Sequence, residues 1–158
     1  MVYYKCMFTL FYRHRPSIKG EYVDLYMTGK EEPASRNCWV NTVNYSICRH
    51  NSYTSIGECD LRIGMNEEIY YAGNIGYRIY DYYRGHGYAY EACQLLFETA
   101  SRKYHMHELI ITCSPENTAS VKTLEKLQGT LVEVAQVPEW HWLWKRGERV
   151  KNIYRYEI

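Results

Sequence analysis

The sequence predicts an α/β protein of the α+β type, with a mixed, mostly antiparallel sheet and one β-α-β crossover. Three observations indicate this class. Segments in which apolar and polar residues alternate occupy much of the first half and the end of the chain, as expected for antiparallel strands. A strand at 73–81 then runs through two glycines into a long stretch with helical spacing of its apolar residues. A continuous apolar run at 109–113 follows, which is the order of a parallel crossover.

The first half of the chain is predicted to form antiparallel strands. In chain order, the predicted elements are strands at 2–12 and 21–28 joined by a turn at 16–20, a polar loop or short helix at 29–37, and strands at 41–49 and 54–63. The last two strands form a hairpin around Asn51 and Ser52, because their apolar residues fall on one face. The expected core residues of this hairpin are Ile47, Ile56, Leu61 and Ile63. A loop that begins at Gly64 and contains Glu67 leads to the strand at 73–81.

The residues after Gly87 are predicted to form a long amphipathic helix. Apolar side chains recur there at i, i+3, i+7 and i+11, which places them on one helical face. The apolar face comprises Ala89, Ala92, Leu96 and Ala100, and the opposite polar face comprises Glu91, Gln94, Glu98 and Arg102. Glu98 and Arg102 stand one turn apart in acid-first order, so we expect them to form an ion pair.

The last third of the chain is predicted to form a strand, a helix and a terminal hairpin. The apolar run at 109–113 is typical of a central strand. Asn117 is expected to cap the following helix, which ends at Gln128 and Gly129. The buried side of this helix carries Val121, Leu124 and Leu127. The final elements are two antiparallel strands at 130–137 and 149–157, separated by a Trp-rich segment at 138–147.

Composition restricts the class of protein. The 158 residues are predicted to form one domain, 1–158, and 46% hydrophobic with 23% charged residues is ordinary for a soluble globular protein. A net charge of +1 gives no electrostatic reason to bind nucleic acid, and no segment approaches the ~20 apolar residues of a membrane span. The six cysteines have no zinc-ligand spacing, and His105 and His107 lack a third ligand, so no metal is predicted. We expect free thiols and a cytoplasmic location.

The segment Arg84-Gly85-His86-Gly87-Tyr88-Ala89 links the strand at 73–81 to the long helix. Glycines allow a tight turn in which successive N–H groups point into one concavity, and the first helical turn adds unpaired N–H groups and the positive end of the helix dipole. A diphosphate is the natural ligand of such a cradle. The alternative is a plain strand-to-helix turn that binds nothing, but two glycines and an alanine give more backbone clearance than a turn requires.

The chain resembles the GCN5-related N-acetyltransferase (GNAT) superfamily, and within it the branch of ribosomal-protein acetylases. The resemblance runs from about Asn41 to the C-terminus and is most specific in the segments Tyr83 to Ala92 and Asn117 to Leu127. It implies a GNAT fold in which the parallel strands at 73–81 and 109–113 splay apart. It also implies an N-acetyltransferase in which a primary amine attacks acetyl-CoA directly in a ternary complex, without a covalent enzyme intermediate.

The resemblance implies a set of residues that bind acetyl-CoA. The backbone of Tyr77, Arg78 and Ile79 would pair with the pantetheine arm as an added strand. The diphosphate would be held by the loop and first helical turn, residues Arg84, Gly85, His86, Gly87, Tyr88, Ala89 and Tyr90. Asn117 would contact the pantetheine arm, or serve only as a helix cap.

Two positions depart from the family pattern and leave the catalytic groups open. The family often has a tyrosine acid seven residues after the equivalent of Asn117, where this chain has Leu124. Ser120 is the candidate acid in its place, unless it is only a first-turn residue of the helix. The frequent glutamate before Ile-Gly-Tyr is Asn74 here.

Replacement bases are Glu58 and Asp60, which share one face of a strand with Arg62 by period-two alternation. A proton could pass from the amine through water to either carboxylate. The alternative is a solvated face with one ion pair.

The acceptor amine is not identified by the sequence, and both a small-molecule amine and a peptide N-terminus fit. Three tryptophans, Trp140, Trp142 and Trp144, are expected near the acceptor side, where they stack on a substrate, cover the terminal strands or form a homodimer contact. A non-catalytic acyl-CoA-binding or sensor module is the alternative function. A nucleotide-binding domain has less support, because no Lys-Ser/Thr follows the glycines.

Overall fold

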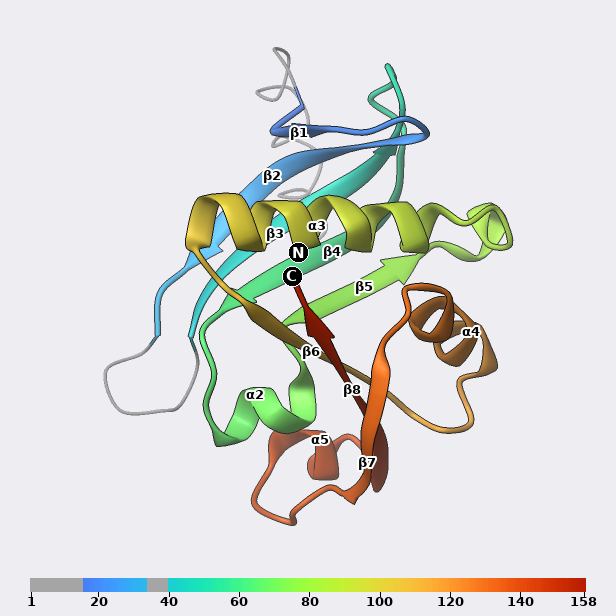
Figure 1. Ribbon diagram of the computed structural model, residues 1–158. Helices are drawn as coiled ribbons and strands as arrows, with labels where there is room; N and C mark the ends of the chain where they lie inside the picture. Colours follow the sequence, from blue (N-terminus) through green and yellow to red (C-terminus); the bar gives the residue numbers. More distant parts are fainter. Residues whose placement is uncertain (1–15, 34–39) are drawn as a thin grey trace, which may run out of the picture.

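The computed structural model describes residues 16–33 and 40–158, and two sheets are seen within them (Figure 1). The five-stranded sheet has the order β1-β2-β3-β4-β5 and the three-stranded sheet has the order β6-β8-β7, with antiparallel pairing throughout. The strands are β1 (Ile18–Lys19), β2 (Val23–Glu31), β3 (Asn41–Arg49), β4 (Ser55–Ile63), β5 (Ile75–Ile79), β6 (Glu108–Cys113), β7 (Thr130–Gln136) and β8 (Val150–Glu157). The strand expected at 2–12 lies outside the described residues, as do residues 34–37 of the segment expected as a loop or short helix at 29–37. Residues 29–31 of that segment instead extend strand β2.

Helices cover these sheets on the sides that carry apolar residues. The helices of the described chain are α2 (Glu67–Ala72), α3 (Tyr88–Tyr104), α4 (Thr118–Lys126) and α5 (Trp142–Lys145), with one 3₁₀ turn, η2 (Asp81–Tyr83). Figure 1 shows α3 crossing one face of the five-stranded sheet, while α2 and α5 lie beside the three-stranded sheet. The predicted α+β class is confirmed, and so is the hairpin of β3 and β4.

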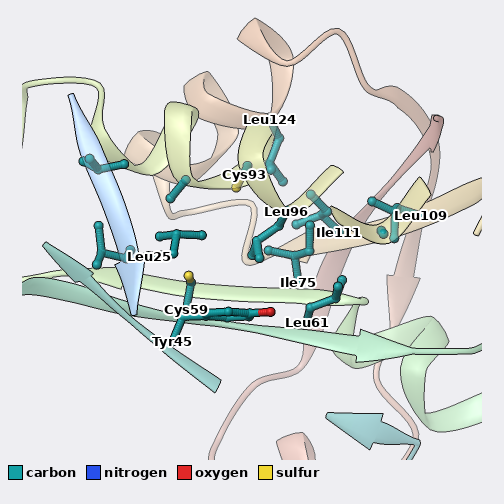
Figure 2. Close-up of a cluster of buried hydrophobic side chains, with 14 of the residues drawn as sticks. Leu25, Tyr45, Cys59, Leu61, Ile75, Cys93, Leu96, Leu109, Ile111 and Leu124 are labelled. Atoms are coloured by element: carbon teal, nitrogen blue, oxygen red, sulfur yellow. The ribbon is translucent and has the colours of Figure 1, made fainter. Parts of the chain in front are cut away.

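One apolar core joins the long helix to both sheets. In Figure 2, side chains from β3, β4 and β5 point toward Cys93 and Leu96 of α3, with Leu124 of α4 and Leu109 of β6 closing the cluster. Ala92, Leu96 and Ala100 are completely buried, as are Ile47, Ile56 and Leu61, while Ile63 is partly buried. The helical and hairpin patterns thus predicted these core residues correctly. Burying one large apolar side chain stabilises the fold by about 1.5–3 kcal/mol, so the apolar face of each element turns inward.

Three local predictions were wrong. The loop after Gly64 contains α2, which Asn66 caps by accepting a hydrogen bond from the N–H of Ile69 at 2.9 Å. The Trp-rich segment likewise contains α5, capped by His141. Both helices are too short for a helical period to be visible in the sequence. The run at 109–113 is not a central strand, because β6 pairs only with β8; its apolar residues reflect burial on both faces, which does not require pairing on both edges.

Glu91, on the predicted polar face of α3, has a structural role that the helical period did not indicate. Its carboxylate accepts backbone N–H groups from the turn between β1 and β2, including those of Tyr22 at 3.0 Å and Val23 at 3.1 Å. Glu98 and Arg102, farther along the same face, form the expected ion pair. Glu91 therefore fixes the start of β2 against the first turn of α3, next to the glycine loop.

The two sheets meet at Asn74, immediately before β5, and diverge from there. The N–H of Asn74 donates to the carbonyl of Ile110 in β6 at 2.6 Å, and its side-chain Oδ1 accepts the N–H of Ile110 at 2.8 Å. Its Nδ2 donates to the carbonyls of Arg62 at 3.0 Å and Gly64 at 2.7 Å. Beyond this junction β5 and β6 form no ladder. The splay between these two strands, expected from the resemblance, is confirmed, and we call it the split.

Candidate active site

The glycine loop at the mouth of the split is open. Gly85 and Gly87 have φ values of +82° and +77°, a region that favours glycine, and a Cβ added at either position would meet nothing within 4 Å. Gly87 is the N-cap of α3 and provides no side-chain cap. The first helical bond runs from the N–H of Glu91 to the carbonyl of Gly87, so the N–H groups of Tyr88, Ala89 and Tyr90 precede the helical ladder. The loop therefore presents backbone donors to an unfilled space, as a diphosphate cradle requires.

Side chains of the loop hold its shape. Arg84 donates from Nε to the carbonyl of Ile79 at 3.1 Å, and its terminal nitrogen lies 2.9 Å from a carboxylate oxygen of Asp81. His86 contacts the carbonyl of Tyr83 through Nδ1 at 3.1 Å and stacks on the ring of Tyr88. The guanidinium of Arg84 remains largely exposed, so it is free to reach an anion in the cradle.

The free edge of β5 faces the split. Asn74 O and Tyr80 N bond to β4, and because backbone groups alternate along a strand, those of Tyr77 and Ile79 point to the opposite edge. The carbonyl of Ile79 is already used by Arg84. Arg78 was grouped with these two residues in the sequence analysis, but its backbone faces β4 and its side chain is exposed. The backbone of Tyr77 and the N–H of Ile79 are thus the groups that could pair with an extended ligand.

Asp60 and Arg62 form a charged pair on the face of β4 opposite the apolar core. Asp60 and Arg62 are mostly buried, and Arg62 Nε lies 2.9 Å from Asp60 Oδ2, a charge contact without the geometry of a hydrogen bond. A Cβ at Gly76 would lie 2.5 Å from Asp60 Oδ1, so the glycine in β5 makes room for this pair. Burial raises the pKa of Asp60, Arg62 lowers it, and the carboxylates of Glu31 and Glu58 raise it further.

Two adjoining cavities lie on this charged face of the sheet. One has a volume of about 410 Å³ and is lined by Glu31, Glu32, Val40, Thr42, Asn44, Asp60 and Arg62. The other, about 310 Å³, is lined by Thr28, Asn44, Tyr45, Glu58, Cys59, Asp60, Tyr77 and Arg78. Asp60 lines both cavities, and the exposed Glu58 lines the second. The structure thus brings the two candidate bases to one hollow beside β5.

Comparison with known proteins decides the family. The family described as acetyltransferase (GNAT) domain matches residues 12–130. The chain belongs to the GNAT family. The uncharacterized N-acetyltransferase YnaD of Bacillus subtilis (strain 168) is 36% identical over 53 residues, which cover 34% of this chain and 31% of YnaD.

Solved GNAT structures have the same fold. A GNAT-family acetyltransferase from Bacillus anthracis is 25% identical, with a TM-score of 0.56 over 73% of this chain and 64% of that one. RimL, a ribosomal L7/L12 α-N-protein acetyltransferase solved with coenzyme A, is 24% identical, with a TM-score of 0.57 over 74% of this chain and 62% of that one. This GNAT chain therefore spans less than two thirds of the length of either protein.

The two departures from the GNAT pattern have structural roles here. Leu124, which stands where the family often has a tyrosine, is completely buried in the core. Asn74, which stands where a glutamate is frequent, is also completely buried and joins the two sheets. Neither side chain can therefore exchange protons with a substrate.

The helix α4 provides the candidate acid. Asn117 caps this helix by accepting the N–H of Ser120 at 3.1 Å, so the capping role expected as an alternative for Asn117 is present. The hydroxyls of Ser120 and Thr123 both interact with the hydroxyl of Tyr77 across the split. Burial raises the pKa of Tyr77 to about 12, although the two hydroxyls lower it. The side chain of Tyr77 was missed in the sequence analysis, because its alternation with Ile75 and Ile79 indicated only a core position.

The Trp-rich segment contacts α2 through Trp140 and His141. Trp140 is half-exposed and lies edge-on to Tyr71, and the buried His141 places Nε2 3.1 Å from the carbonyl of Glu68. Trp142 and Trp144 lie in α5, so the three tryptophans do not form a single stripe. These contacts attach the segment to α2, and in the described chain none of its residues lines either charged cavity.

Residues 16–33 and 40–158 contain no group of three or more His, Cys, Asp and Glu side chains placed to hold a metal ion. Over the same residues, every helix is too short or too polar to span a bilayer. Of the six cysteines, the four within the described ranges, Cys48, Cys59, Cys93 and Cys113, are buried free thiols. Burial raises the pKa of Cys93 to about 12, which makes it a poor nucleophile at neutral pH.

Proposed function

We propose that this GNAT chain transfers an acetyl group from acetyl-CoA to a primary amine by direct attack in a ternary complex. The observation that carries the proposal is the open double-glycine loop at the N-terminus of α3, adjoining the free edge of β5. Backbone donors of Gly85, Gly87, Tyr88, Ala89 and Tyr90 would bind the diphosphate. RimL, which shares this fold, was solved with coenzyme A.

The residues along the split fit acetyl-CoA in order. Bound acetyl-CoA supplies the thioester, an activated acyl group. The N–H and carbonyl of Tyr77 and the N–H of Ile79 would hold the pantetheine arm by strand-like pairing, which delivers the thioester toward the cavities beside Asp60. Holding the amine and the thioester in one geometry supplies most of the acceleration that such a transfer needs.

The proposed base is Asp60, with Glu58 as the second candidate. Attack requires a neutral amine, so a proton must leave the ammonium group. Asp60 is enclosed, lines both cavities and has a raised pKa, so it holds a proton more readily than an exposed carboxylate. Arg62 keeps it ionised and oriented before the proton arrives. Ser120 is the proposed donor to the departing sulfur.

Asp60→Asn is expected to lower kcat/KM about 100-fold, in line with the loss of a general base. In the wild type, kcat/KM should fall as the pH drops through the raised pKa of Asp60, and the variant should lack that limb of the profile. Glu58→Gln is the matched control, because Glu58 lines one cavity but is exposed. If Glu58→Gln removes the limb and Asp60→Asn does not, the assignment of the base is reversed.

The carboxyl group of Asp60 also makes the free energy of unfolding depend on pH. Because the pKa of Asp60 is higher in the folded protein, the folded state binds the proton more tightly than the unfolded chain does. The stabilising contribution is therefore complete below the unfolded pKa and is lost as pH rises through the folded pKa. Urea unfolding of the wild type and Asp60→Asn across that range measures the difference.

The acceptor is proposed to be a small-molecule amine or a peptide N-terminus. RimL acts on a ribosomal protein N-terminus according to its name, which favours a peptide. The alternative function, non-catalytic acyl-CoA binding, is favoured by Leu124 and Asn74, since both usual catalytic positions have structural roles. The homodimer and the cytoplasmic location stay predictions from the sequence.

Two measurements on the wild-type protein test the proposal. Acetyl-CoA should raise the melting temperature, while ATP and NAD should not, because a ligand bound only to the folded state stabilises it. Free CoA should then be released in the presence of a panel of amines that includes peptides with free N-termini. A thermal shift without CoA release from any amine would favour the binding module, and the absence of any shift would exclude both functions.

A further inference from the structure

The hydroxyl of Tyr77 is enclosed by protein and has no partner with hydrogen-bond geometry within the described residues, although the hydroxyls of Ser120 and Thr123 lie close enough to lower its pKa. Tyr77 pairs with Cys59 across the β4–β5 ladder, so its ring lies on the core face of the sheet. A buried hydroxyl without a partner is destabilising, because it has lost its hydrogen bonds to water. Tyr156, another tyrosine of this core, avoids the cost by donating to the carbonyl of Leu124 at 2.9 Å. The unpartnered hydroxyl of Tyr77 therefore requires an explanation.

The groups next to this hydroxyl are two hydroxyls of α4, one of which is already engaged. Thr123 donates its proton to the carbonyl of Ala119 at 2.9 Å. Ser120 makes no such back-bond in the described part of the chain, and only its N–H is used, by Asn117. Ser120 and Tyr77 thus face each other across the split, each with an uncommitted proton.

We propose that Tyr77 is a positioning residue for Ser120: the Tyr77 hydroxyl donates to Ser120 Oγ and thereby directs the proton of Ser120 toward the sulfur of the bound thioester. This inference rests on the proposed function. The donor role is consistent with the raised pKa of Tyr77, about 12, which keeps its proton in place at neutral pH. A serine hydroxyl has one proton and accepts at its oxygen, so a donor on one side leaves its proton for the other side.

The transfer step balances with these groups. The amine nitrogen forms a bond to the thioester carbonyl carbon, the carbon–sulfur bond breaks, and its electron pair stays on sulfur. Ser120 donates a hydrogen bond to this thiolate, and Tyr77 donates to Ser120. Asp60 takes the ammonium proton before the attack and releases it to solvent, the second proton passes from the nitrogen to Asp60 as the amide forms, and solvent returns one proton to sulfur to give CoA. Tyr77 and Ser120 both keep their protons, so no co-reactant is needed.

Tyr77→Phe is the test, because it removes only the hydroxyl. We expect kcat to fall about tenfold, while the KM for acetyl-CoA and the thermal shift with acetyl-CoA stay unchanged. The melting temperature without ligand should change little, because the Tyr77 hydroxyl has no partner with hydrogen-bond geometry in the ligand-free chain. Tyr156→Phe is the matched control: it loses a satisfied buried hydroxyl, so it should melt lower but retain kcat.

A double-mutant comparison separates positioning from an independent role. Ser120→Ala should lower kcat at least as much as Tyr77→Phe, and adding Tyr77→Phe to Ser120→Ala should cause no further loss. A further tenfold loss in the double variant, or full activity of Tyr77→Phe, would overturn the inference.

Binding of CoA itself gives a second readout that needs no acceptor. Donors at the sulfur favour its thiolate, so CoA affinity should increase in the wild type as the pH rises toward the pKa of the CoA thiol. Tyr77→Phe should weaken this increase several-fold, and an equal increase in both proteins contradicts the inference. If the wild type binds acetyl-CoA but releases no CoA with any amine, the proposed function is wrong. That outcome is distinct from the failure of the Tyr77 inference, which the comparison of Tyr77→Phe with the wild type detects.

Discussion

Gly87→Glu is expected to abolish the rise in melting temperature that acetyl-CoA causes. For a ligand at about 100 times its Kd, that rise corresponds to ~2.7 kcal/mol, or roughly 5–10 °C for a chain of this size. The added side chain would project into the open space that the loop now presents, because a Cβ at this position meets nothing within 4 Å. Its carboxylate would also repel the diphosphate at the positive end of the α3 dipole. Thermal denaturation with and without acetyl-CoA measures the effect.

Gly147→Glu is the matched control for backbone strain. Gly147 has a φ of +89° and also has no atom within 4 Å of an added Cβ, but it follows α5 rather than the glycine loop. Both substitutions place an L side chain in the left-handed region, at a cost of about 1–2 kcal/mol. Both proteins should therefore melt lower without ligand, and only Gly87→Glu should lose the response to acetyl-CoA. If the two variants respond equally, the loop does not hold the diphosphate.

Asn74→Ala is expected to cause the largest loss of stability. The substitution leaves the N–H of Ile110 and the carbonyls of Arg62 and Gly64 without their side-chain partner. Asn74 is completely buried, so water does not replace those bonds. At about 1–3 kcal/mol for each unsatisfied group, with some relaxation, we expect a loss of ~3–4 kcal/mol in the free energy of unfolding. Urea denaturation gives this value directly.

Thr112→Val provides a comparison in the same region. Thr112 donates one hydrogen bond to the carbonyl of Tyr71 at 2.8 Å, so the valine variant should lose only about 1 kcal/mol. Asn74→Asp should be as damaging as the alanine variant, because it replaces two donated bonds with a buried charge. Equal, small losses for Asn74→Ala and Thr112→Val would mean that Asn74 does not hold the two sheets together.

The glycine loop and α3 were predictable because their signals are local. Gly85 and Gly87 precede a helix whose apolar residues repeat with a helical period, and the φ values and the burial of Ala92 follow that pattern. The hydrogen bonds of Glu91 could not be predicted, for the complementary reason. Its partners are backbone groups about 70 positions earlier in the chain, and a helical period cannot distinguish a carboxylate in water from one that accepts N–H groups of a distant turn.

In the candidate site, too, the local pattern was predictable and the contacts between strands were not. Alternation along β4 correctly placed Asp60 and Arg62 on one face, opposite Cys59 and Leu61. It did not indicate that Gly76 of the neighbouring strand clears the space for the ion pair. That contact depends on the register between β4 and β5, which two-residue alternation in one strand leaves undetermined.

The sequence by itself determined the strand-glycine-helix order, the family resemblance and the residues of the core, because periodicity and glycine placement act over a few neighbouring positions. Only the tertiary structure decided that Asn74 closes one end of the split, that Glu91 secures the β1–β2 turn, and that the hydroxyl of Tyr77 meets Ser120. Each of these depends on groups brought together from distant parts of the chain. These groups pair because polar atoms that are buried away from water need hydrogen-bond partners within the protein.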